Sequence, residues 1–171
     1  MHKTIKAAID FVKNNSLTPK EYLAISMQQN DIILLGEHHA IKENIQCLID
    51  SIPLLYDAGM DYLGMEFGCE EDQNTLTKLL TSNHFDENLA RSLLFNYNTL
   101  FAYQDYLDLY KAVFDFNQTL PKNSRKLLIL NLSYRYHWDF NESTNITELT
   151  RMKITFNRGG TERFRLKQIM K

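Results

Sequence analysis

The sequence predicts an α/β protein with a small, mainly parallel sheet of about three strands, flanked by many helices. Three short apolar runs suggest the strands: residues 32–35, 62–65 and 126–132. Unbroken runs of this kind are typical of strands covered on both faces, as in parallel sheets. The segments between the runs have the apolar spacing of helices. This combination of elements is the pattern of an α/β fold.

The helical segments follow from periodicity and from start and stop signals. Thr18, Pro19 and Glu21 match the cap, first position and third position of a helix, and Asp86 is placed to cap another. Pro53 is expected to bend its helix or end it early. The predicted helices cover residues 3–14, 19–28, 41–56, 72–80, 86–95 and 101–116, with a last pair after residue 147 that is interrupted at residues 158–160.

The order of these segments predicts a βαβ unit over residues 32–65, with parallel strands and a right-handed crossover. A sheet of only three strands leaves an uncovered edge. The last predicted helix, residues 161–171, also lacks a cap signal. We therefore expect one domain over residues 1–171 whose fold is incomplete at its C-terminal end.

The composition is that of a soluble globular protein. The 171 residues are 44% hydrophobic and 23% charged, which argues against disorder. Cys47 and Cys69 make no disulfide framework, and no stretch suggests a secretion signal or membrane span. We expect a cytoplasmic protein that does not act at a membrane.

The charge is distributed unevenly. Residues 1–119 hold 8 Lys/Arg and 17 Asp/Glu, a balance of −9, whereas residues 120–171 hold 11 and 4, a balance of +7. A basic face for an anionic ligand is one interpretation; solvation beside the acidic body is the more ordinary one. Basic and aromatic residues do not cluster in any nucleic-acid-binding pattern, so no nucleic-acid partner is expected. The oligomeric state cannot be read from the sequence.

Ionisable side chains follow two of the predicted strands. Glu37, His38 and His39 come after the first, in LLGEHH, and Glu66 comes after the second. Ligands of open α/β sheets sit beyond the carboxyl ends of the strands. If the strands are neighbours, both glutamates reach one crevice. The alternative is that a glutamate caps the next helix and one histidine faces solvent.

Several chemistries are open to such a group. Glu43 shares a helical face with His39 if the helix begins that early. Carboxylates can orient a histidine for general-base work, or two glutamates and one histidine can hold a divalent metal. His137 follows the third strand and is a further candidate for the same crevice, whereas His84 reads as a turn residue. Arg158 and Arg163 can bind an anion, although surface solvation is the default.

The pattern IILLGEHHAIKENI, then a helix, then YLGMEFG, resembles the superfamily that joins erythromycin esterases, ChaN-like haem-binding proteins, TraB/Tiki proteins and a domain of a Pasteurella toxin. Its members show a strand ending in G-E-x-H and, one helix later, a strand ending in Glu. Gly36, Glu37, His39 and Glu66 match these positions. The resemblance spans roughly residues 30–165, and its specific part is four or five positions.

The resemblance implies a catalytic crevice of Glu37, His39 and Glu66, in which the histidine activates water and the glutamates orient it. Glu43, His38 and His137 would bind a small-molecule substrate. The Tiki branch implies metal-dependent peptide cleavage, and the ChaN branch implies haem binding without turnover.

Two departures bear on these implications. His39 is three residues after Gly36, as in the ChaN and TraB patterns, whereas the esterase branch places it one later. Members of the superfamily also carry a second half, and we expect this chain to correspond to an N-terminal fragment that ends where that half begins. An esterase-like hydrolase is therefore the leading hypothesis, and a haem- or metal-binding module or an inactive truncated remnant are its rivals.

Overall fold

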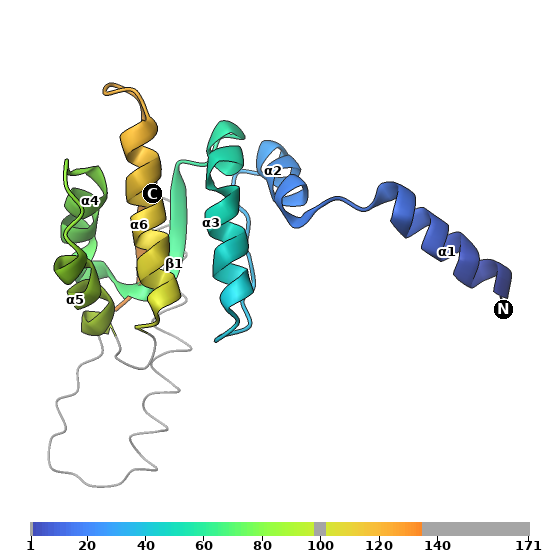
Figure 1. Ribbon diagram of the computed structural model, residues 1–171, viewed down its shortest axis with the longest axis horizontal. Helices are drawn as coiled ribbons and strands as arrows, with labels where there is room; N and C mark the ends of the chain where they lie inside the picture. Colours follow the sequence, from blue (N-terminus) through green and yellow to red (C-terminus); the bar gives the residue numbers. More distant parts are fainter. Residues whose placement is uncertain (1, 98–101, 135–171) are drawn as a thin grey trace, which may run out of the picture. The chain divides into compact units, whose positions relative to one another are not determined.

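The computed structural model describes residues 2–97 and 102–134, which form helices and a parallel sheet and so confirm the predicted α/β class. The chain divides into two compact units, residues 1–60 and 61–171. Figure 1 labels the helices and strands of both units along the sequence.

The first unit contains three helices at the predicted places: α1 (His2–Asn15), α2 (Pro19–Gln29) and α3 (Lys42–Asp57). The capping box before α2 is confirmed. The Glu21 N–H donates to Thr18 Oγ1 over 3.3 Å, and Glu21 Oε2 accepts from the Thr18 N–H over 2.9 Å. This reciprocal pair satisfies two of the N–H groups that a helix start leaves without partners.

Helix α3 contacts α2, and its apolar residues Ile45, Ile52 and Leu55 are buried. Pro53 lies inside α3, and the helix continues for another turn to Asp57, so it does not end early. The chain then reverses at Gly59, whose φ of 110° is one that side chains rarely adopt. This turn closes with a hydrogen bond from the Met60 N–H to the Leu55 carbonyl.

The predicted strand at residues 32–35 is wrong. These residues form no regular element, and Ile32, Leu34 and Leu35 are 50%, 84% and 60% exposed. An apolar run becomes a strand only when its backbone pairs with the edge of another strand. The sequence of the run itself does not specify that partner. The βαβ unit predicted over residues 32–65 is therefore also wrong.

The sheet of the second unit pairs β1 (Tyr62–Cys69) with β2 (Leu128–Ser133) in parallel, and both correspond to predicted strands. The connection between them contains η1 (Glu70–Asp72), α4 (Gln73–Thr81), α5 (Glu87–Tyr97) and α6 (Gln104–Thr119). The register is regular up to Met65 opposite Asn131. It then shifts, so that Cys69 lies opposite Ser133 and β1 carries two extra residues.

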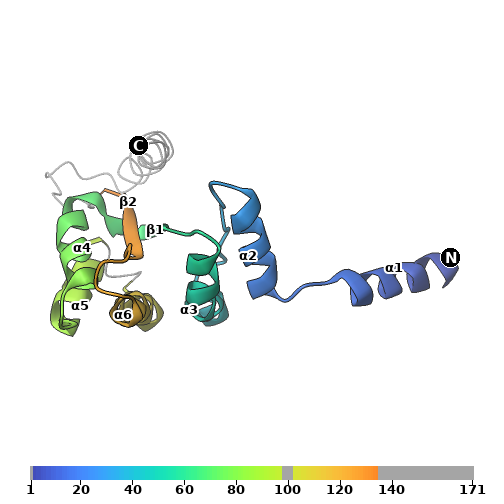
Figure 2. The ribbon, with the colours of Figure 1, turned by 90° about the horizontal axis from the view of Figure 1, so that it is seen from above.

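Helices α4, α5 and α6 gather on one face of this sheet, and Figure 2 shows β1 and β2 side by side next to them. Alternate strand residues point to that face, so Met65, Ile129 and Asn131 are buried. Phe67 contacts Tyr97 of α5 and Tyr106 of α6, with ring centroids 5.9 and 5.2 Å apart. Tyr106 of α6 is therefore part of the core.

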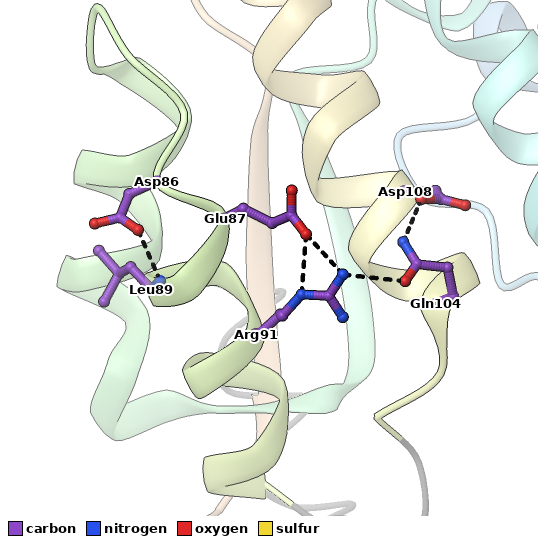
Figure 3. Close-up of polar contacts among 6 residues, drawn as sticks. All are labelled: Asp86, Glu87, Leu89, Arg91, Gln104 and Asp108. Atoms are coloured by element: carbon purple, nitrogen blue, oxygen red, sulfur yellow. Dashed lines mark hydrogen bonds and ion pairs between the residues drawn. The ribbon is translucent and has the colours of Figure 1, made fainter.

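A polar chain on the surface joins α5 to α6 (Figure 3). Arg91 donates to Glu87 Oε1 through Nε over 3.0 Å and through Nη2 over 2.6 Å, and Nη2 also reaches Gln104 Oε1 at 3.4 Å. At the start of α5 the Leu89 N–H donates to Asp86 Oδ1 over 3.0 Å, which confirms the predicted cap. The exposure of these groups makes their contribution to stability small.

The side-chain amides of Asn117 and Gln73 bond the backbone groups on the edge of β2 that faces away from β1. The Leu128 N–H donates across to the Asp61 carbonyl, so the backbone groups of residues 127, 129 and 131 point away from β1. Asn117 pairs with both backbone groups of Leu127. Gln73 donates to the Ile129 carbonyl over 2.9 Å and accepts from the Asn131 N–H over 2.8 Å. The amides thus occupy positions that a third strand would take.

Candidate functional site

The structure brings Glu37 and His39 together on the connection between α2 and α3. Glu37 Oε1 lies 3.5 Å from His39 Nδ1, and the two side chains are 26% and 51% exposed. Because the pair is on a loop, solvent reaches the imidazole. A carboxylate beside Nδ1 of a histidine is the arrangement that orients the ring for general-base work.

The backbone around this pair is held in an unusual turn. Ala40, the residue after His39, has a φ of 64°, in the left-handed region that side chains disfavour. Asn44 Nδ2 on α3 donates to the His38 carbonyl over 3.1 Å, and His38 Nδ1 lies 3.2 Å from the His39 carbonyl. These contacts tie His38 to its own loop. Strained turns kept by surrounding contacts are frequent at functional sites.

Glu43 lies elsewhere in the first unit. Helix α3 begins at Lys42, after Ile41, so His39 precedes the helix and does not share a helical face with Glu43. Glu43 instead lines a shallow groove of about 380 Å³ between α2 and α3. The groove is lined by Thr18, Pro19, Lys20, Glu43, Gln46, Cys47 and Asp50.

An ordered polar contact crosses this groove. Gln46 Nε2 donates to Asp50 Oδ1 over 2.8 Å, and Lys20 Nζ lies 3.5 Å from Asp50 Oδ2. The amide of Gln46, and to a smaller degree the charge of Lys20, lower the pKa of Asp50. The Lys20–Asp50 ion pair links the polar sides of α2 and α3. It is formed by residues other than Glu37 and His39.

Glu66 belongs to the second unit and lies within β1, not after it. The strand continues to Cys69, and Glu66 is exposed on the face opposite the helices. It stands where the register shifts, between Met65 and Cys69. A bulge re-aims the side chains that it contains, which is a physical reason to keep Glu66 as a candidate although the strand does not end there.

The remaining candidates fall outside the site or outside the described residues. His84 is exposed in the loop after α4, as expected for a turn residue. His137, Arg158 and Arg163 lie outside the described residues, as does the predicted last pair of helices.

Sequence reasoning missed a group of buried polar residues at the carboxyl ends of β1 and β2. Tyr110, Asn131 and Ser133 are 0%, 2% and 2% exposed, and Cys69 beside them is 1% exposed. Burial, and then the neighbouring groups of Cys69 and Asp72, raise the pKa of Tyr110. The sequence LILNLS of β2 could have indicated Asn131 and Ser133. Alternate residues of a strand point to the same face, which places both of them on the same face as Ile129.

Among the residues that the structure describes, no three His, Cys, Asp or Glu side chains of either unit gather closely enough to hold a metal ion. None of the described helices has the length and apolar character needed to cross a membrane.

Comparison with known proteins leaves the resemblance as a prediction. No protein-family model matches the chain, and neither the curated proteins nor the solved structures contain a significant match.

Proposed function

We propose that the protein is a hydrolase of esterase-like type, in which His39, oriented by Glu37, activates a water molecule. The observation that carries the proposal is the 3.5 Å contact between Glu37 Oε1 and His39 Nδ1 on a solvent-accessible turn. In this scheme the imidazole takes a proton from water through Nε2 as the water attacks a carbonyl carbon. The carboxylate stabilises the positive charge that the ring then carries.

The resemblance also implies a carboxylate from Glu66, which belongs to the second unit, so the proposed reaction is argued from Glu37 and His39 of the first unit. A carboxyl group exposed at a bulge is accessible to a substrate. The imidazolium of His39 then returns the proton to the leaving alkoxide or amine as the ester or amide bond breaks. The substrate is a small molecule with an ester or amide bond. Cys47 is a free thiol, which accords with the reducing conditions of a cytoplasmic location.

The test is turnover of p-nitrophenyl esters and of a fluorogenic peptide by the purified chain, with the variants His39→Ala, Glu37→Gln and Glu66→Gln. We expect His39→Ala to lower kcat/KM by at least 100-fold, as is typical for the loss of a general base. His84→Ala is the matched control, because His84 is exposed and lies outside the site. Its activity should equal that of the unmodified protein.

The rival proposals have distinct signatures in the same experiment. Absence of turnover with a Soret shift on adding haem, lost in His39→Ala, would favour the haem-binding module. Metal-dependent turnover abolished by a chelator would favour the peptidase branch. A folded protein with neither signal would overturn the hydrolase proposal.

A further inference from the structure

Two consecutive backbone carbonyls in the turn that carries His39 are each held by a side chain. Asn44 Nδ2, from the first turn of α3, donates to the His38 carbonyl over 3.1 Å. His38 Nδ1 lies 3.2 Å from the His39 carbonyl. A carbonyl oxygen only accepts hydrogen bonds, so Nδ1 of His38 must carry the proton in this contact.

These two bonds hold the peptide groups on both sides of His39. The His38 carbonyl belongs to the peptide that joins His38 to His39, and the His39 carbonyl belongs to the peptide that joins His39 to Ala40. Because each peptide group is planar, fixing both planes also fixes the direction of the Cα–Cβ bond of His39. The imidazole keeps only its own side-chain rotations, and Glu37 Oε1, 3.5 Å from Nδ1, restricts those.

The turn needs this restraint because Ala40 has a left-handed φ of 64°. A residue with a side chain is disfavoured in that region and would relax to an ordinary negative φ if the turn were free. Such a rotation would turn the peptide between His39 and Ala40 and carry the imidazole away from Glu37. The bonds made by Asn44 and His38 oppose this rotation.

We propose that Asn44 and His38 are positioning residues, which hold the turn so that the His39 imidazole stays beside Glu37. This inference rests on the proposed role of His39 as the general base. It gives His38 a role different from the substrate contact that the resemblance implies. Neither Asn44 nor His38 touches the reacting atoms in this scheme. Losing either should therefore lower kcat and leave KM nearly unchanged, because the substrate is still bound while the base is misplaced.

Two substitutions of Asn44 separate positioning from stability. Asn44→Ala and Asn44→Asp both remove the donor to the His38 carbonyl. Neither should weaken α3, because alanine is the best helix former and a carboxylate is favourable in the first turn of a helix. We expect each to lower kcat by about tenfold or more.

Asn14→Ala and Asn14→Asp are the matched controls, because Asn14 is exposed on α1 and lies outside the turn. They should leave kcat unchanged. Thermal unfolding should give the Asn44 variants a Tm no lower than that of these controls. Unchanged kcat in both Asn44 variants would overturn the role of Asn44, and so would a loss of kcat that follows a loss of Tm.

Substitutions of His38 distinguish a bond to the turn from a bond to the substrate. His38→Ala removes the donor to the His39 carbonyl, whereas the side-chain amide of His38→Asn can replace the Nδ1–H group. We therefore expect His38→Ala to lower kcat by about tenfold, and His38→Asn to restore most of the loss. A raised KM with an unchanged kcat in His38→Ala would assign His38 to the substrate and overturn its positioning role.

An NMR measurement tests the same inference without turnover. Correlation spectra of the ring nitrogens show which nitrogen of a neutral histidine carries the proton, and a hydrogen bond to the ring sets that choice. His38 and His39 should both be Nδ1–H forms, with the exposed His84 as the reference in the same spectrum. In Asn44→Ala the His39 ring should lose this fixed form. If it does so in a protein without esterase activity, the proposed function fails while the positioning stands. An unchanged His39 signal would overturn the positioning.

Discussion

The side-chain amide of Asn117 pairs with both backbone groups of Leu127, ten residues later in the chain. Asn117 Nδ2 donates to the Leu127 carbonyl over 2.8 Å, and Oδ1 accepts from the Leu127 N–H over 2.9 Å. The same Nδ2 also donates to the Leu80 carbonyl over 3.1 Å. One buried amide thus joins α4, α6 and the start of β2, and it imitates the pairing of a neighbouring strand.

Replacing Asn117 with leucine should destabilise the second unit strongly. The change leaves the N–H and carbonyl of Leu127 and the carbonyl of Leu80 buried without partners, and the expected loss is about 2–5 kcal/mol. Urea unfolding followed by circular dichroism measures it. Asn123→Leu is the matched control, because Asn123 is exposed in the turn before β2. A loss below about 1 kcal/mol at Asn117 would show that the amide is not what holds this edge.

Gln73 has the same role one step further along β2, and Gln73→Leu should open that edge. The Ile129 carbonyl and the Asn131 N–H would lose their partners, with an expected loss of about 1–3 kcal/mol. An open strand edge also invites pairing between molecules. Light scattering after size exclusion should therefore show larger species at high concentration.

The control for this change is Asn74→Leu, the next residue on the same helix, which is exposed and makes no contact with β2 among the interactions described. It adds the same apolar side chain without opening the edge. Equal association of both variants would mean that added surface hydrophobicity, not the edge, is responsible.

The sequence predicted the elements whose signals are local. Thr18, Pro19 and Glu21 encode a helix start within four residues, and the structure contains that capping box. Asp86 signals the start of α5 in the same way. Such signals can be read because each depends on contacts between residues three or four apart.

The parts that sequence reasoning missed depend on contacts between distant residues. The apolar run at residues 32–35 resembles a strand, but pairing is decided by which edge is available, and β1 pairs with β2. Gln73 contacts β2 across 56 and 58 residues, and nothing in its local sequence marks it. Glu66 likewise lies within β1, not after it, at a register shift that depends on how β1 pairs with β2.

Gly68 should not tolerate a side chain. A Cβ at this position would lie 2.0 Å from Asn131 Oδ1 and 2.6 Å from Asn131 Cγ. Asn131 cannot move away easily, since it is buried and its Nδ2 bonds the Cys69 carbonyl. Gly68→Ala should therefore cost about 1–3 kcal/mol of unfolding free energy, measured by urea denaturation.

Gly36→Ala is the matched control for Gly68→Ala. A Cβ at Gly36 meets no atom within 4 Å, and its φ is not among the positive values. This change should be neutral or stabilise by less than about 1 kcal/mol, because alanine restricts the unfolded chain. If Gly68→Ala were as mild as the control, the close packing of β1 on Asn131 would be disproved.

The capping box should make the start of α2 sensitive to acid. Hydrogen bonds from the Thr18 N–H and hydroxyl lower the pKa of Glu21 in the folded protein. A carboxyl group with a lowered pKa stabilises the fold above its unfolded pKa, and this contribution is lost as pH falls through the folded pKa. NMR titration of the Glu21 side chain should show the lowered value, and Thr18→Ala should return it toward normal. An unchanged Glu21 titration in Thr18→Ala would contradict the assignment.

Ala40→Gly should stabilise the turn that presents His39. The left-handed φ of 64° destabilises alanine at this position by about 1–2 kcal/mol. Glycine relieves this strain, but its greater conformational freedom also stabilises the unfolded chain and offsets part of the gain. The expected net increase in the free energy of unfolding is therefore about 0.5–1 kcal/mol. Ala58→Gly is the control, because its φ of −76° is ordinary and no gain should follow. Thermal unfolding of both variants gives the comparison. If the two changes have the same effect, Ala40 is not strained, and the turn beside Glu37 and His39 is held by its hydrogen bonds alone.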